Sequence, residues 1–138
     1  MSEATTPEAE SLIEELSGRF LALVKKDKSL EFLTRQHQIV DAYGKSVWSV
    51  ELGIRHGNLL PFECYHIAPD ERTILTPSAS WIQELYQHGA EGFIGGSLNR
   101  LKKIQRWILS KGYELAEEDR HLHHELTLRN DRVNVYKK

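Results

Sequence analysis

The chain has 138 residues, of which 40% are apolar and 28% are charged, and this composition excludes an intrinsically disordered or a fibrous chain. Its single cysteine, Cys64, excludes an internal disulfide framework and a multi-cysteine zinc site. The formal net charge of −2 is uneven: residues 1–90 carry 8 basic and 13 acidic side chains, residues 91–138 carry 10 basic and 7 acidic ones, and this asymmetry predicts a basic C-terminal part.

The first part of the chain predicts a helix, an ambiguous element and a β-hairpin. Residues 1–6 are expected to be a flexible N-terminus that precedes a single domain of residues 7–138. Pro7 after Thr6 is typical of a helix start, and apolar residues at helical spacing continue this helix to about residue 26. Residues 30–43 fit both a strand and a helix, and we favour a helix. Residues 47–55 and 62–67 have the two-residue period of strands, which predicts a hairpin.

The second part of the chain predicts two helices and a second hairpin. Pro77 after Thr76 predicts another helix start, and Ser97 is expected to cap a third helix that Gly112 ends. Asn130-Asp131 predicts a two-residue turn within a hairpin of residues 121–137, with Leu128 opposite Val133 and Leu126 opposite Val135. We therefore predict an α+β fold, in which an antiparallel sheet built from two β-hairpins packs against about three helices.

The helix of residues 97–111 is strongly basic and is the main candidate for binding a partner. It contains five basic residues and no acidic one: Arg100, Lys102, Lys103, Arg106 and Lys111. Trp107 lies between these cations and away from the apolar stripe, so it is a candidate anchor for a protein or a nucleic-acid base. Arg129 and Arg132 extend the basic surface onto the predicted hairpin. The alternative is a solvated basic face whose tryptophan packs on a neighbouring element.

The glycine-rich segment before this helix is a candidate anion site. Gly95, Gly96 and Ser97 would offer free backbone N–H groups to a phosphate or carboxylate at a helix start. The alternative is an interhelical hinge and cap. Neither GxxxxGK[ST] nor GxGxxG occurs, and we predict no cofactor.

The order of the predicted elements, with GxxG at residues 89–92 and again at 92–95, resembles the bacterial type of K-homology domain. This resemblance implies a glycine loop that clamps a nucleic-acid backbone. The chain departs from the family because its loop lacks basic residues, Glu91 has the opposite charge, and Leu98 replaces the second glycine of the Ile-Gly-x-x-Gly pattern.

Three histidines lie close together in the predicted C-terminal hairpin. In the predicted register, His121 and His123 share the polar face of one strand, while His124 faces the core. Alternate residues of a strand are about 7 Å apart, a spacing from which two imidazoles can bind one metal ion. The favoured alternative is an exposed histidine pair without a metal.

Three functional hypotheses follow. The leading one is a non-catalytic protein-binding or assembly module, an adaptor that docks an acidic partner through its basic C-terminal half. The second is an RNA- or DNA-binding module that uses the glycine-rich segment and the basic helix. The third is a small enzyme with a histidine or metal site, and we favour a protein without catalysis. The acidic opening and the lack of a long apolar run predict a cytoplasmic protein that does not enter membranes, and a homodimer is compatible with the sequence.

Overall fold

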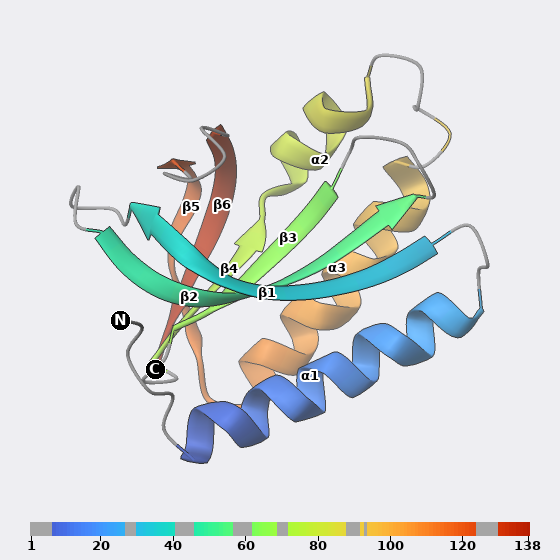
Figure 1. The fold of residues 1–138 in the computed structure, drawn as a ribbon. Coiled ribbons are helices and arrows are strands. Elements are labelled where there is room, and N and C mark those ends of the chain that lie inside the picture. The colour runs from blue at the N-terminus through green and yellow to red at the C-terminus, as the bar shows by residue number, and fades with distance from the viewer. Residues whose placement is uncertain are drawn as a thin grey trace.

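In the residues that the computed structural model describes, three helices and a six-stranded antiparallel sheet form the fold, which confirms the α+β prediction (Figure 1). The structure describes residues 7–26, 30–40, 46–56, 62–68, 72–87, 92, 94–123 and 130–138; the predicted flexible N-terminus, residues 1–6, lies outside this part. The elements are α1 (Pro7–Lys25), β1 (Leu30–Val40), β2 (Ser46–His56), β3 (Phe62–Ile67), β4 (Thr73–Pro77), α2 (Ala79–Tyr86), α3 (Ile94–Ser110), β5 (Glu114–His123) and β6 (Asn130–Lys137). None of these helices has both the length and the apolar character needed to cross a membrane.

The sheet has the strand order β1-β2-β3-β4-β6-β5. β1 pairs with β2 along its whole length, from Leu30 opposite His56 to Val40 opposite Ser46. β2 pairs with β3, which confirms the hairpin predicted for residues 47–67. β4 lies between β3 and β6, and Val40 of β1 also pairs with His123 of β5, so the strand order closes on itself.

Two of the predicted elements are wrong. Residues 30–40 form strand β1 rather than a helix, because their two-residue period places Leu30 and Phe32 in or against the core, where the Phe32 ring stacks on Phe20 at 5.7 Å between centroids. Pro77 ends strand β4 rather than starting a helix. The helix starts two residues later, where the Ser78 hydroxyl caps α2 by accepting a hydrogen bond from the Trp81 backbone N–H at 3.1 Å.

The C-terminal hairpin forms, but its register and extent differ from the prediction. Asn130 and Asp131 are the first residues of β6 rather than a turn, and Val133 and Val135 lie opposite Arg120 and Glu117. Residues 124–129, which include the predicted partners Leu126 and Leu128, lie outside the described part of the chain. The register shifts twice along β5, near a left-handed Asp119 with φ of 52°. Such bulges insert unpaired residues, so counting back from a turn could not give the observed pairing.

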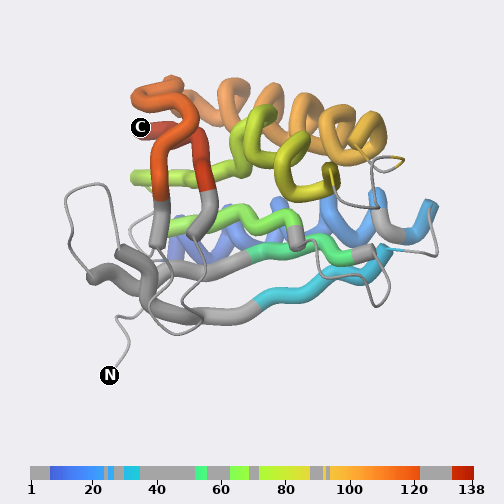
Figure 2. The backbone as a smooth tube through the Cα atoms, turned by 90° about the horizontal axis from the view of Figure 1, so that it is seen from above, coloured from blue at the N-terminus to red at the C-terminus, as the bar shows by residue number. Residues whose placement is uncertain are grey.

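The main core lies between the sheet and the three helices. Its largest fully buried side chains come from every one of these layers: Phe20, Leu16, Leu52, Ile54, Tyr65, Ile67, Ile74, Ile82, Tyr86, Ile104, Ile108 and Tyr113. Seen from above, α2 and α3 lie together along one side of the molecule, while β1 and β2 lie along the other (Figure 2). A smaller cluster of Leu75, Val133 and Val135 is formed by the neighbouring strands β4 and β6. The helices therefore each have one face fixed in the core and one face in solvent.

Candidate functional site

The outward face of α3 carries three exposed cations, Lys102, Lys103 and Arg106, which we call the basic stripe. The opposite face of the helix is fixed in the core by Leu101, Ile104 and Ile108. Among the described residues, no ion pair engages any of the three cations of the stripe. Leu109, which is 51% exposed, lies one turn after Arg106 and adds apolar surface at the end of the stripe. The fold thus holds on one helix face an exposed leucine and three positive charges that no described residue pairs.

Trp107 does not belong to this stripe, and the prediction of an exposed aromatic anchor is wrong. Its side chain is only 4% exposed and packs in the core. The indole N–H donates to Glu15 Oε1 of α1 at 3.2 Å, and Arg19 and Lys111 lie over the ring at 5.5 and 5.6 Å from its centroid. The alternative that the sequence left open, a tryptophan packed on a neighbouring element, is confirmed, because α1 covers this side of α3.

Lys111 is also engaged where α1 meets α3. Its ammonium group pairs with Glu15 Oε1 at 2.9 Å. The hydrogen bonds from Lys111 and Trp107 lower the pKa of the Glu15 carboxyl below its usual 4.5. Lys111 therefore connects two helices of the same chain rather than extending the basic stripe.

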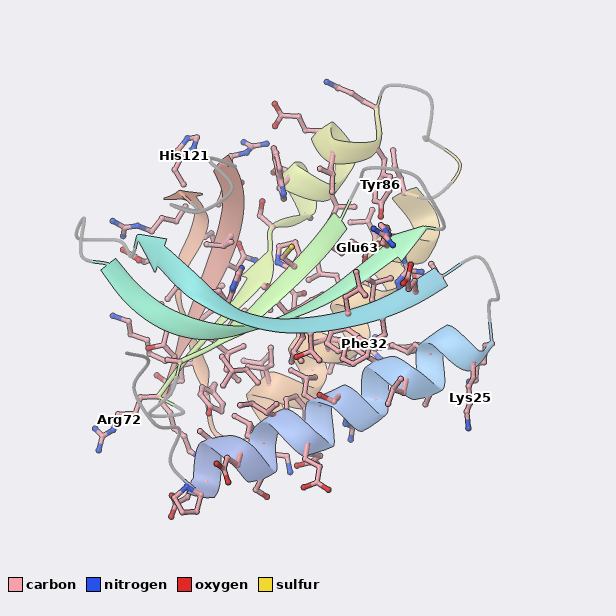
Figure 3. The ribbon with its side chains drawn as sticks, in the orientation of Figure 1. Lys25, Phe32, Glu63, Arg72, Tyr86 and His121 are labelled. Carbon is pink, nitrogen blue, oxygen red and sulfur yellow. The ribbon has the colours of Figure 1, made fainter. Side chains whose placement is uncertain are left out.

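Arg100 points into the molecule, where it meets a carboxylate that the sequence analysis did not select. The Glu63 cluster consists of Glu63 on β3, Tyr86 on α2, and Ser97 and Arg100 on α3. Figure 3 labels Glu63 and Tyr86, which lie close together. Arg100 Nη2 donates to Glu63 Oε2 at 2.7 Å, and the hydroxyls of Tyr86 and Ser97 each donate to the same oxygen at 2.6 Å. Arg100 is 9% exposed and Glu63 is 1% exposed. Three donors on one oxygen compensate for the loss of water around this carboxylate and tie three elements together.

Only one feature of the sequence indicated the Glu63 cluster. Successive side chains of a strand point to opposite faces of the sheet. Glu63 therefore lies on the same face of its strand as Tyr65 and Ile67, which are apolar. Both faces of β3 are buried, since Cys64 and His66 on the other face are 3% and 1% exposed. A carboxylate at such a position needs an internal cation, and Arg100 supplies it from 37 residues away.

The residues of the predicted anion-binding loop form part of the first turn of a helix, so Ser97 does not cap it, and anion binding by their backbone N–H groups stays a prediction. Gly95, Gly96 and Ser97 lie inside α3, which begins at Ile94. The Ser97 hydroxyl is buried and bound to Glu63, so the anion that it meets is a side chain of the same protein. The second GxxG string of the K-homology resemblance likewise ends within this helix, and most of the first string lies outside the described residues.

Arg132 belongs to a separate structural network that contacts both ends of α2. Its guanidinium pairs with Glu84 and with Asp119, whose Oδ2 lies 3.0 Å from Arg132 Nη1. Asp119 Oδ1 in turn accepts a hydrogen bond from the Ser78 hydroxyl at 2.6 Å, and its backbone N–H donates to Asn134 Oδ1 at 3.0 Å. These contacts join the β5–β6 hairpin to α2 and explain why a left-handed Asp119 is tolerated.

The histidines and Arg129 are only partly described. His121 is exposed on β5 opposite Arg132, near the upper end of that strand in Figure 3. The backbone of His123 is described, but its side chain, His124 and Arg129 are not. Within the described side chains, no group of three His, Cys, Asp or Glu residues could hold a metal ion. The metal site at His121 and His123 stays a prediction.

Three buried tyrosines make the stability of the protein sensitive to alkaline pH. Burial raises the pKa of Tyr65, Tyr86 and Tyr136 above the usual 10.0, and the nearby Glu63 carboxylate raises it further for Tyr65 and Tyr86. A raised pKa stabilises the fold fully below pH 10, and this contribution is lost as the pH rises towards the folded-state values.

We therefore expect these tyrosines to ionise only as the protein unfolds above pH 10. Near-ultraviolet tyrosinate absorbance and circular dichroism, recorded together, should change in one step, while the chain in guanidinium should show tyrosine ionisation near pH 10. Ionisation of all tyrosines near pH 10 with the fold intact would contradict this expectation.

The structure thus brings Lys102, Lys103 and Arg106 together on one surface and separates them from Arg100, Trp107, Lys111 and Arg132. No protein-family model matches the chain, and comparisons with curated proteins and with solved structures also give no match.

Proposed function

We propose that this protein is a non-catalytic binding module that docks an acidic protein partner through the basic stripe of α3. The observation that carries the proposal is the set of three exposed cations on one helix face with no ion pair to any described residue. Charged groups of this kind guide association and set its specificity. A cytoplasmic location is part of the proposal and fits the single, buried Cys64.

A protein partner fits this surface better than a nucleic acid does. Recognition of single strands generally adds aromatic stacking to basic residues. The one aromatic ring of α3, Trp107, is buried and already lies beneath Arg19 and Lys111, so it is not available for stacking. The exposed Leu109 beside the stripe favours a partner that offers apolar as well as acidic side chains.

The proposal predicts that charge reversal of the stripe removes binding to an acidic partner. The probe is a fluorescent helical peptide rich in glutamate and leucine, and binding is followed by anisotropy at low and high salt. The variant Lys102→Glu/Lys103→Glu/Arg106→Glu is expected to bind the peptide at least about tenfold more weakly, because like charges then face each other. Wild-type affinity is expected to fall as salt increases.

A control of equal charge change compares the two-site reversal Lys102→Glu/Lys103→Glu with a two-site reversal on another helix. Lys25 and Lys26 are exposed at the end of α1, so Lys25→Glu/Lys26→Glu should leave peptide affinity within about twofold of wild type if only the stripe binds. Equal loss in both variants would show an unspecific charge effect and refute the site. Preference for single-stranded RNA or duplex DNA over the peptide would replace the proposal with the nucleic-acid hypothesis.

A further inference from the structure

The outward face of α1 contains a glycine that the fold of one chain does not require. Gly18 is exposed and lies in the middle of this 19-residue helix. A Cβ added at Gly18 would meet no atom of a described residue within 4 Å, so an alanine would fit without rearrangement. Glycine weakens the interior of a helix, because its backbone loses more freedom on folding than that of alanine. Gly18 therefore destabilises α1 without a steric reason within the chain.

Gly18 belongs to a line of four exposed residues on α1. Glu14, Gly18, Leu21 and Lys25 are separated by four, three and four positions, so they lie one above another along the helix, and we call them the α1 seam. Alternation of three and four positions is the spacing at which one helix contacts another along its length. The seam thus has the spacing of a helix–helix contact but lies at the surface.

The α1 seam is free of contacts that would explain it within one chain. Leu21 is 49% exposed. Among the described residues, no ion pair engages Glu14 or Lys25. In Figure 1, α1 is the lowest element of the molecule, and Figure 3 shows Lys25 pointing away from the rest of the chain at the end of this helix. A partner can therefore approach the seam from solvent.

The residues of the α1 seam are complementary to the same residues in reverse order. Two such helices can lie antiparallel, with a two-fold axis that passes midway between Gly18 and Leu21 of each. Glu14 of each copy then faces Lys25 of the other, and Leu21 of each copy faces Gly18 of the other. Opposite charges meet at both ends of the contact, and a large apolar side chain meets the open surface above a glycine at its centre.

We propose that two copies of this chain associate through their α1 seams, antiparallel around a two-fold axis. The two-fold axis makes each contact occur twice. A glycine at the contact lets two helices approach closely, towards the short end of the usual interaxial range of about 8–10 Å. One pair of helices buries a small area, so we expect a weak dimer. The inference goes beyond the proposed function, because the seam shares no residue with the basic stripe of α3.

Charge reversal tests the two ends of the proposed contact. Glu14→Lys and Lys25→Glu each place like charges opposite each other at both ends, so each dimer should dissociate at least about tenfold more readily than wild type. The double variant Glu14→Lys/Lys25→Glu has opposite charges at both ends again and should regain the wild-type affinity within about threefold. Lys26→Glu is the matched control. It makes the same change one residue further on, about 100° around the helix axis, and should alter the dimer by less than about twofold.

Substitution of Gly18 tests the centre of the contact. Gly18→Leu fills the surface that receives Leu21 of the other copy, so it should weaken the dimer at least about tenfold. The same change should leave the fold as stable as wild type or more stable, because leucine favours a helix and open space surrounds the position. Urea unfolding of the dilute protein measures this stability. A dimer unchanged in Gly18→Leu would overturn the inference.

The measurement of association is sedimentation equilibrium at low salt, over a concentration series that reaches about 1 mM. Circular dichroism confirms that each variant is folded. A wild-type dimer that is weakened by each single reversal and recovered in the double variant supports the inference. A wild type that stays monomeric, single reversals without effect, a double variant without recovery, or an equal loss in Lys26→Glu overturns it. Binding of the acidic peptide to the same variants tests the proposed function separately.

Discussion

Glu63→Leu is expected to lower the free energy of unfolding by about 3–5 kcal/mol, because it leaves a buried charge without its partner. Arg100 loses the carboxylate that lies 2.7 Å from its Nη2, and the hydroxyls of Tyr86 and Ser97 lose the acceptor that they share. Leucine is similar in size to glutamate, so the loss of hydrogen bonds and of charge dominates over any change in packing. Urea unfolding followed by circular dichroism measures the effect.

Two controls separate the buried charge from other causes. The double variant Glu63→Leu/Arg100→Leu removes both charges and should recover most of the lost stability, because apolar side chains replace buried ion pairs well. Glu31→Leu breaks the exposed ion pair in which Arg55 Nη2 lies 2.6 Å from Glu31 Oε2. It should lower the free energy of unfolding by at most about 1 kcal/mol. A double variant less stable than Glu63→Leu would mean that the cluster acts through its hydrogen bonds rather than through charge compensation.

Trp107→Ala is expected to destabilise the protein by about 3–5 kcal/mol, the range for truncating a large aromatic side chain in a core. The indole fills the contact between α1 and α3, donates its N–H to Glu15 and lies beneath Arg19 and Lys111. All of these contacts disappear in the alanine variant, and a cavity remains. Thermal and urea unfolding both report the loss.

The comparison with milder changes shows whether Trp107 stabilises the fold or binds a partner. Trp107→Phe keeps an aromatic ring and should lose less stability while still binding the acidic peptide. Leu109→Ala changes a half-exposed side chain on the same helix and should alter stability by no more than about 0.5 kcal/mol. If Trp107→Ala is as stable as the wild type but no longer binds the peptide, the result would favour the interpretation of Trp107 as an exposed anchor.

The sequence was most informative where one face of an element meets the core. In α1 and α3 the apolar spacing matched the structure, and Gly112, with φ of 94°, follows the end of α3 as predicted. β1 was ambiguous because its spacing also fits a helix, and only pairing with β2 over its whole length resolves the choice. β4 was not predicted because five residues are too few to show a period.

For the candidate site, the sequence by itself determined the three exposed cations of α3, because they lie opposite the apolar stripe of Leu101, Ile104 and Ile108. Only the tertiary structure decided which other residues join them. It buried Arg100 beside Glu63 and Trp107 beside Glu15, which is 92 residues away in the chain. Local spacing records which side of a helix is apolar, whereas contacts between distant segments depend on the packing of the whole chain.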